Sequence, residues 1–192
     1  MNLAKKYSDG MLDIETLATS PNAVVIQVGF VPFDISSGVV GKNKFLINIS
    51  SEDCQKYGLE TNPDTIAFWE KQDRAIWNST QENPQPLEVA LRELAAFIRQ
   101  NLSSSRRRIW SHATFDIPVV SNAYNVAGIE IPWNYRETRD IRTLNWLHTS
   151  LLEKKEKENA PRENAHNALA DCLYQIEYVC RLHSDLNSAL TI

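Results

Sequence analysis

The sequence is poor in cysteine and has no long run of apolar residues. Its three cysteines form no CxxC pair, so neither a disulfide framework nor a thiolate zinc site has the residues it needs. No apolar stretch approaches the roughly 18 residues of a membrane span. Acids at Asp9, Asp13 and Glu15 interrupt the N-terminal segment where a signal peptide would have its apolar core. These absences predict a soluble protein of the reducing cytoplasm without a membrane partner.

The composition is that of an ordinary folded domain with a slight excess of acid. Hydrophobic residues make up 43% and charged residues 23% of the 192 residues, which excludes disordered, collagenous and coiled-coil chains. At about 100 to 200 residues per domain, this length predicts one domain over residues 1–192. The net charge of −4 disfavours a partner that is held by broad positive charge, as nucleic acids usually are.

Hydrophobic periodicity predicts strands in the first part of the chain and alternating strands and helices afterwards. Five strands are expected, at residues 10–17, 23–34, 39–49, 108–113 and 131–137. A turn signal at 35–38 makes the second and third strands an antiparallel hairpin. Helices are expected from Asn62, from Pro86 to about Leu102, after Phe115, from Asp140 to Leu152 and over 165–187, and a short segment carries Ile76 and Trp77 between the first two. This order indicates one α/β domain.

Two acids stand on the first predicted strand. Asp13 and Glu15 are two residues apart, so their side chains project from the same face, about 6 to 7 Å apart at the backbone. Two carboxylates on an otherwise apolar strand repel each other unless a cation lies between them. The pair therefore indicates a cation site, and the alternative is a solvent-facing edge strand with two ordinary acids.

Two further acids stand in the second half of the chain. Asp116 follows the fourth predicted strand and opens a helix, at the kind of strand end where open α/β sheets bind ligands. The alternative is that its carboxylate caps the helix. Asp171 lies among small and apolar residues of the last predicted helix, five residues after His166. Four acids of this kind favour a shared metal-binding cluster over four unrelated roles.

These residues follow each other in a recognisable pattern. DxE at Asp13 and Glu15, FD at Asp116 and H-x4-D at His166 and Asp171 together resemble the motifs of DEDDh-family 3′-5′ exonucleases. The local sequence is most similar to the branch that contains exonuclease VIII-like proteins, phage exonuclease A and mycobacterial exoribonucleases. The resemblance extends over about residues 9–187. It implies a ribonuclease H-like fold, with a central five-stranded mixed sheet whose second strand is antiparallel and which helices flank.

The resemblance also implies two divalent ions, Mg²⁺ or Mn²⁺, which prefer carboxylate oxygens to thiolates. Asp13, Glu15 and Asp171 would hold the ion that activates water. Asp13 and Asp116 would help to hold the second ion with the substrate phosphate. Two such ions can supply the nucleophile and neutralise charge on the leaving oxygen. His166 would be the general base, because imidazole titrates near neutral pH.

The implied reaction is hydrolysis of phosphodiester bonds at nucleic acid 3′ ends, with single strands favoured and nucleoside 5′-monophosphates released. DNA is the expected substrate. The alternatives are a 3′-5′ exoribonuclease with the same mechanism and a nucleic-acid-binding module without catalysis. The complete set of four acids and a histidine favours the enzyme. Related small exonucleases are often dimers, so the resemblance also includes a possible homodimer.

Substrate contacts are expected beside the acids. Thr16 and Leu17 follow the DxE strand, and the resemblance implies that they contact the terminal nucleotide, with Phe115 beside it. Trp69 is a candidate platform for base stacking. The alternative for Trp69 is that it seals a helix on the core. His112 stands where many members of the family have Asn.

The remaining basic residues are less specific. Two clusters of arginine are present, at Arg136, Arg139 and Arg142 and at Arg106–Arg108. Either cluster could follow a phosphate backbone or form an ordinary solvated face. His148 and His183 have no acidic partner at metal-ligand spacing and are expected to be surface or partly packed residues.

Overall fold

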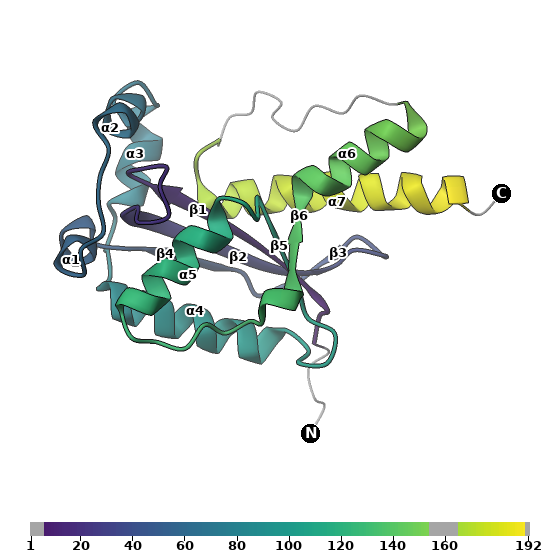
Figure 1. Ribbon diagram of the computed structural model, residues 1–192, viewed down its shortest axis with the longest axis horizontal. Helices are drawn as coiled ribbons and strands as arrows, with labels where there is room; N and C mark the ends of the chain where they lie inside the picture. Colours follow the sequence, from purple (N-terminus) through teal and green to yellow (C-terminus); the bar gives the residue numbers. More distant parts are fainter. Residues whose placement is uncertain (1–5, 154–164, 191–192) are drawn as a thin grey trace.

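The computed structural model describes residues 6–153 and 165–190, and its centre is a six-stranded mixed sheet (Figure 1). The strands are β1 (Asp9–Thr16), β2 (Val25–Asp34), β3 (Val39–Val40), β4 (Phe45–Asn48), β5 (Arg108–Ser111) and β6 (Thr138–Asp140). They lie in the order β3-β2-β1-β5-β6, and β4 also pairs with β2. β2 is antiparallel to β1, whereas β5 and β6 extend the sheet in parallel. The predicted mixed sheet with an antiparallel second strand is confirmed.

The third predicted strand is divided in two, which makes six strands instead of the predicted five. β3 and β4 are separated at Gly41, whose N–H donates a hydrogen bond of 2.7 Å to the carbonyl oxygen of Pro32. A Cβ at Gly41 would lie only 2.9 Å from that oxygen, so the bend requires the glycine. Both pieces still pair antiparallel with β2, as the predicted hairpin requires.

The predicted strand at 131–137 is wrong, because its second half forms the 3-10 turn η1 (Tyr135–Glu137). The side chain of Asn134 accepts a hydrogen bond from the Arg136 N–H, and the Glu137 carboxylate accepts one from the Asn134 N–H. This reciprocal cap satisfies the donors that a strand would have used in a ladder. The strand β6 that pairs with β5 begins only at Thr138.

The described residues include seven α-helices. They are α1 (Ser51–Lys56), α2 (Pro63–Trp69), α3 (Arg74–Thr80), α4 (Leu87–Asn101), α5 (Asp116–Val126), α6 (Ile141–Leu152) and α7 (Ala168–Leu190). The short α1 has no counterpart among the predicted helices, although Ser50 caps it by accepting from the Asp53 N–H, a local signal that the sequence carries. Among the described residues, no helix is long and apolar enough to cross a membrane.

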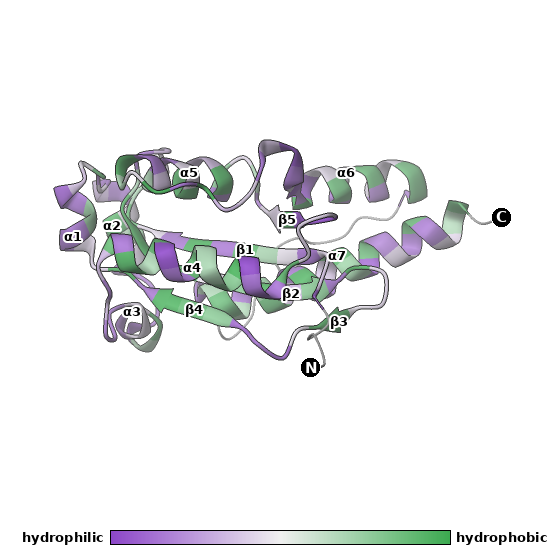
Figure 2. Ribbon diagram, turned by 90° about the horizontal axis from the view of Figure 1, so that it is seen from below, coloured by the Kyte–Doolittle hydropathy of each residue, from purple (hydrophilic) through white to green (hydrophobic). Residues whose placement is uncertain are grey.

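Helices cover both faces of the sheet and form two cores. Residues of α4 and α5 pack with Leu12 and Ile14 of β1 on one face. Residues of α6 and α7 pack with Met11 of β1 on the other face. The apolar face of α4 consists of Leu87, Ala90, Leu91, Leu94, Ala95 and Ile98, all of which are buried. Figure 2 shows the apolar residues concentrated along β1, β2 and β4, with polar residues alternating along α4.

The alternation of β1 directs its two acids toward α7. Asp13 and Glu15 follow Met11 at a spacing of two, so they share the sheet face that α6 and α7 cover. Asp13 pairs in register with Gly29 of β2. A Cβ at Gly29 would lie 2.4 Å from the carbonyl oxygen of Ala168, so only glycine lets the first turn of α7 lie this close to the sheet. The start of α7 and the end of β1 are thereby brought together.

A buried ion pair joins the beginnings of β1 and β5. Asp9 is fully buried and accepts two hydrogen bonds of 2.6 Å from the guanidinium of Arg108. The indole Nε1 of Trp110 donates to the same carboxylate at 2.9 Å. Within the basic run, Arg107 also pairs with Glu137, at 3.1 Å. Two of the three arginines at 106–108 thus hold the fold together.

We expect Asp9→Ala to lower the free energy of unfolding by about 2 kcal/mol or more, because Arg108 and Trp110 would lose a buried acceptor. Urea denaturation followed by circular dichroism measures this. Arg106→Ala is the matched control: Arg106 is exposed, so its loss should change the free energy by no more than about 0.5 kcal/mol. Equal effects of the two substitutions would contradict the assignment of the ion pair.

Candidate active site

Four carboxylates from three elements meet in one cavity. Asp13 and Glu15 come from the end of β1, Asp116 is the first residue of α5, and Asp171 lies in the first turn of α7. All four are buried, with exposed fractions between 2% and 8%. With His166 they line a cavity of about 200 Å³, whose other lining residues are Ile14, His112, Phe115, Arg142 and Gln175. The structure therefore brings together all five residues predicted to be catalytic.

The structure contradicts the alternative roles of the acids, a solvent-facing edge strand for Asp13 and Glu15 and a helix cap for Asp116. β1 lies between β2 and β5, so Asp13 and Glu15 are not on a solvent-facing edge strand. Asp116 is not the N-cap of α5: the cap position is Phe115, and no side chain caps the helix there. Instead, the Asp116 carboxylate accepts a hydrogen bond of 2.8 Å from the N–H of His112. This bond turns the carboxylate back toward the end of β5.

Burial and mutual repulsion make the cavity unfavourable for four negative charges. Burial raises the pKa of Asp13 well above its usual value, and the neighbouring charges of Asp116, Glu15 and Asp171 raise it further. Burial also raises the pKa of Asp116 to about 8, although the hydrogen bond from His112 and the charge of Arg142 oppose the rise. A cation in the cavity would relieve this cost, because it stabilises the ionised form of each acid.

The donor atoms fit a divalent cation. One ligand atom each from Glu15, His166 and Asp171 lies within 4.8 Å of the other two, as in a metal site. Asp13 and Asp116 add further carboxylate oxygens to the same cavity. Mg²⁺ and Mn²⁺ prefer oxygen ligands of this type. The chemistry and proximity of the side chains thus fit the predicted metal-binding role of the four acids.

Gln175 is a site residue that the motifs did not include. Its Nε2 donates a hydrogen bond of 2.6 Å to Oδ1 of Asp13, and its side chain is buried in the acid cavity. Gln175 lies four residues after Asp171 on α7, so both side chains lie on the same face of the helix. This spacing is the sequence signal that could have identified it. Its amide holds one Asp13 oxygen in a fixed direction.

A polar network attaches the beginning of α7 to the sheet. The Oε1 atom of Gln27, a buried residue of β2, accepts from the N–H of Ala168 at 2.8 Å. The Nε2 of Gln27 donates to Asn48 of β4 at 2.7 Å. Asn48 in turn donates to the carbonyl oxygens of Ser79 and Glu82. This chain of bonds positions the segment that carries His166 and Asp171 relative to β1.

His166 has an unusual backbone conformation. Its φ is +68°, in the left-handed region that non-glycine residues seldom adopt. Its N–H donates to Oδ2 of Asp171 at 3.2 Å, which holds the turn before α7. Its ring packs edge-to-face on Phe68, with the ring centroids 5.0 Å apart. Such strained positions are common at functional sites, where the surrounding structure maintains them.

A second cavity of about 440 Å³ adjoins the acids and contains three of the four predicted substrate residues, Thr16, Phe115 and Trp69. It shares Ile14, Glu15 and Phe115 with the acid cavity. Its remaining lining residues are Thr19, Asn62, Asp64, Thr65 and Phe68. The volume and the mixture of aromatic and polar groups are typical of a small-molecule site.

Trp69 and Leu17 are both integrated into the protein core. Trp69 is 4% exposed, and its Nε1 donates to the carbonyl oxygen of Thr16 at 2.9 Å. Leu17 is also buried and does not line the second cavity; its N–H donates to Val24, and its carbonyl oxygen accepts from Asn62. The predicted substrate contacts of Trp69 and Leu17 stay predictions.

The other predicted basic residues have different environments. Arg139 donates to the carbonyl oxygens of Arg136 and Thr138, whereas Arg142 lines the acid cavity. Arg136 bonds to the Tyr135 hydroxyl. His148 is fully buried between α6 and α7, with its Nε2 3.0 Å from a carboxylate oxygen of Asp185, and His183 lies beside Asn187. Of the arginines in these clusters, Arg142 is the one that the structure places at the acids.

Solved structures share this fold at low sequence identity. E. coli exonuclease I in complex with a dA16 oligonucleotide has a TM-score of 0.66 at 16% identity, over 94% of this chain and 41% of that chain. The zinc-bound form of the E. coli exonuclease I–ssDNA complex has a TM-score of 0.64 at 16% identity, with 96% and 43% covered. Cell-death related nuclease 4 (CRN-4) has a TM-score of 0.66 at 12% identity, with 93% and 64% covered. The chain spans less than two thirds of each of these proteins.

The predicted ribonuclease H-like fold is confirmed by these similarities. The acid cavity at the end of β1 contains the four acids and the histidine of the DEDDh pattern. A family model described as the 3′-5′ exoribonuclease Rv2179c-like domain matches residues 8–182, and the chain belongs to this family. A comparison with curated proteins found no match. The predicted resemblance to DEDDh-family 3′-5′ exonucleases is therefore confirmed.

We expect Asp116→Asn to stabilise the metal-free protein. Because the pKa of Asp116 rises from 3.8 to about 8 on folding, the folded state binds more protons than the unfolded state between about pH 4 and pH 8. The free energy of unfolding therefore falls as the pH rises through this range. The uncharged Asn side chain of the variant does not ionise, so the variant does not lose this stability. At pH 8 in EDTA, the Tm of the variant should exceed that of the wild type by about 2 to 4 °C, roughly 1 kcal/mol for a chain of this size.

Differential scanning fluorimetry checks this prediction, with Glu52→Gln as the control. Glu52 is an exposed acid on α1, so its neutralisation should shift the Tm by less than about 1 °C. Mn²⁺ should raise the Tm of the wild type more than that of Asp116→Asn, because the variant lacks one anionic ligand. A lower Tm for Asp116→Asn than for the wild type in EDTA would contradict the repulsion described above.

Proposed function

We propose that this protein is a metal-dependent 3′-5′ exonuclease that removes nucleoside 5′-monophosphates one at a time from the 3′ ends of single strands. The observation that carries the proposal is the convergence of four buried carboxylates and His166 in one cavity, beside a second cavity of about 440 Å³. We take residues 1–192 as a single 3′-5′ exonuclease domain, which contains all five proposed catalytic residues. The matching family model is described as a 3′-5′ exoribonuclease domain, which supports degradation from the 3′ end.

The acids would hold two Mg²⁺ or Mn²⁺ ions. Asp13, Glu15 and Asp171 are proposed as the ligands of one ion, and Asp13 and Asp116 as ligands of the second. Bound divalent ions would lower the pKa of the attacking water and stabilise negative charge on the leaving oxygen. The protein supplies the orientation: Gln175 fixes Asp13, and the His112 N–H fixes Asp116.

His166 is proposed as the general base. Its ring nitrogen lies within 4.8 Å of carboxylate oxygens of Glu15 and Asp171, so a water among these side chains would be near both the base and the ligands. The edge-to-face contact with Phe68 limits rotation of the imidazole. The hydrogen bond from the backbone N–H of His166 to Asp171 holds the proposed base at a fixed position relative to one proposed metal ligand.

The second cavity would bind the 3′-terminal nucleotide. Phe115 and Phe68 offer rings for contact with the base or sugar, and Thr16 lies at the edge shared with Glu15. Trp69 would then act chiefly by supporting this wall from the core, and Leu17 by fixing the β1–β2 connection, in addition to any direct contact. A nucleotide seated there would present its 5′-phosphate to the acids.

RNA is the substrate that we propose first. The family description supports it, and the second cavity contains polar groups on Thr16, Thr19, Asn62, Asp64 and Thr65 that could exchange hydrogen bonds with a ribose 2′-hydroxyl. DNA is the second candidate. It is supported by the similarity of the fold to exonuclease I, which was solved with single-stranded DNA.

Asp13→Ala and His166→Ala should abolish most of the activity. We expect a loss of about 10³-fold or more for Asp13→Ala, which removes a ligand, and of about 10²- to 10⁴-fold for His166→Ala, which removes the base. A 5′-labelled single strand incubated with Mn²⁺ and resolved as a ladder measures the rate. His183→Ala removes a histidine of α7 that lies outside the cavity, and this variant should retain full activity. Identical ladders for the wild type and Asp13→Ala would refute the proposal.

Matched RNA and DNA strands decide the sugar preference. We expect kcat/KM for a single-stranded RNA to exceed that for the DNA of the same sequence by about fivefold or more, because one additional hydrogen bond contributes about 1 kcal/mol. Double-stranded forms of both should be shortened more slowly than the single strands. A higher kcat/KM for DNA would reverse the order of the two candidates while leaving the 3′-5′ exonuclease proposal intact.

A further inference from the structure

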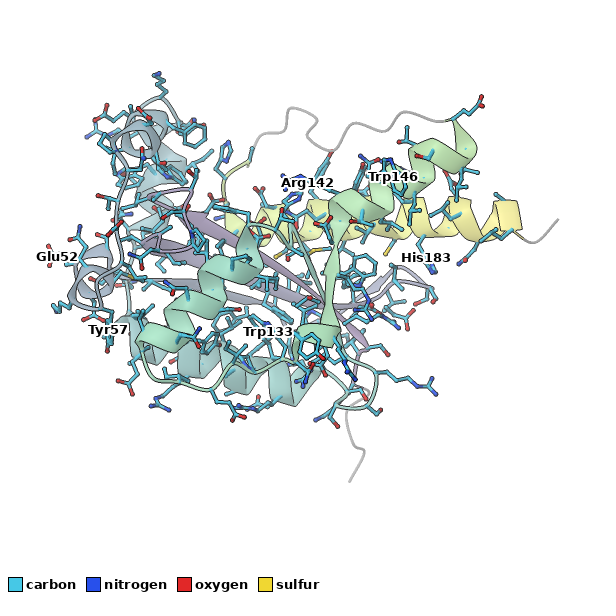
Figure 3. All side chains as sticks on the ribbon, in the orientation of Figure 1. Glu52, Tyr57, Trp133, Arg142, Trp146 and His183 are labelled. Carbon is cyan, nitrogen blue, oxygen red and sulfur yellow. The ribbon has the colours of Figure 1, made fainter. Side chains whose placement is uncertain are left out.

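Helix α6 begins at the acid cavity and carries an exposed aromatic side chain one turn later. Arg142, in the first turn, lines the cavity. Trp146 follows four residues later, about 6 Å farther along the helix axis, and the spacing puts both side chains on the same face. Figure 3 shows Arg142 at the beginning of α6 and Trp146 farther along it.

The exposure of Trp146 distinguishes it from the other tryptophans. Trp146 is 65% exposed, whereas Trp69, Trp110 and Trp133 are buried and Trp77 is half-buried. The buried tryptophans belong to the two hydrophobic cores. A large aromatic ring in water contributes little to folding, and Trp146 lies one helical turn from Arg142, which lines the acid cavity.

The surface around Trp146 suits a polyanion. Residues Ile141–Leu152 contain no Asp or Glu, although the whole chain has a net charge of −4. The carboxylate of Asp140, which precedes the helix, already accepts hydrogen bonds from Thr143 and Ala113. The exposed positions beside Trp146 on this face are Arg142, Thr143 and Ser150, which are cationic or neutral. A phosphate backbone would therefore meet no acid of α6 here.

The position of α6 continues the path of the substrate. The second cavity lies against α2, and α2 and α6 lie on opposite sides of the first turn of α7, where the acids meet (Figure 1). A strand whose terminal nucleotide occupies the second cavity and whose scissile phosphate lies at the acids would leave the cavity past Arg142. The next part of the strand would then lie along α6.

We propose that Arg142 and Trp146 form a strand-binding strip for the single-stranded nucleic acid on the 5′ side of the scissile bond. The guanidinium of Arg142 would contact a phosphate, and the indole of Trp146 would stack on an unpaired base. Such stacking is sequence-tolerant, as a general exonuclease needs. The strip rests on the proposed function, because it assumes that the 3′ end enters the second cavity.

Equilibrium binding tests the strip without requiring hydrolysis. The probe is a 5′-fluorescein oligouridylate of about twelve nucleotides with phosphorothioate linkages, measured by fluorescence anisotropy in Mn²⁺. Trp146→Ala should weaken binding about tenfold, from the usual contribution of one base–aromatic contact. Trp146→Phe should recover most of the affinity. Leu151→Ala removes another exposed apolar side chain of α6, 62% exposed, and should leave the affinity unchanged.

Strand length provides a second measurement. The loss caused by Trp146→Ala should appear only with strands long enough to reach α6, so a dinucleotide should bind the variant and the wild type within about twofold of each other. Quenching of the exposed Trp146 fluorescence by the long strand, absent in Trp146→Phe, would support the strip directly.

Three outcomes would overturn the strip. Equal affinity of Trp146→Ala and the wild type for the long strand is the first. The second is an equal loss for Leu151→Ala together with a change of oligomeric state by light scattering, which would assign this face to a second copy of the chain. In both cases intact cleavage by the wild type would preserve the proposed function. A wild type that neither binds nor cleaves any strand would remove both proposals.

Discussion

The carboxylates of Asp13, Glu15, Asp116 and Asp171 occupy one buried cavity, and the charges of the other three raise the pKa of Asp13 beyond the rise that burial causes. Ordinary folding would not select such an arrangement, because buried like charges oppose the packing that surrounds them. A bound cation would relieve this cost, because it stabilises the ionised form of each acid. The remainder of the structure can be understood as the scaffold that maintains this unfavourable cluster.

The scaffold acts through close approach and through polar bonds. Gly29 lets α7 contact the sheet where no Cβ would fit, and Gln27 bonds to the first N–H of the helix. Gln175 then holds Asp13 from α7. The Asp9–Arg108 pair joins β1 to β5 at the opposite end of the strand. Rigid elements thus fix acids from distant parts of the sequence within one cavity, as the proposed two-metal chemistry requires.

Hydrophobic periodicity predicted the helices and strands correctly where burial of an apolar face or run was the dominant local signal. The apolar face of α4 and the continuous apolar run of β2 were sufficient to identify both elements. The prediction at 131–137 was wrong because the reciprocal cap between Asn134 and Glu137 outweighed strand propensity. α1 was missed although Ser50 and Asp53 carry its cap, because its six residues are too few to show periodicity. The expectation that His148 is a surface or partly packed residue was wrong: it is fully buried, and its partner Asp185 lies on another helix, 37 residues away, where no local spacing shows it.

The sequence by itself indicated which acids and which histidine belong together, because their order resembles the DEDDh motifs and the DxE pair follows the strand period, which operates over a few residues. It also determined the α/β class and the antiparallel second strand. Only the tertiary structure decided that Arg142 lines the acid cavity, that Trp69 is buried beside the second cavity, and that Trp146 faces water. These facts depend on contacts between elements far apart in the chain, and no local pattern encodes which side chains such contacts leave exposed.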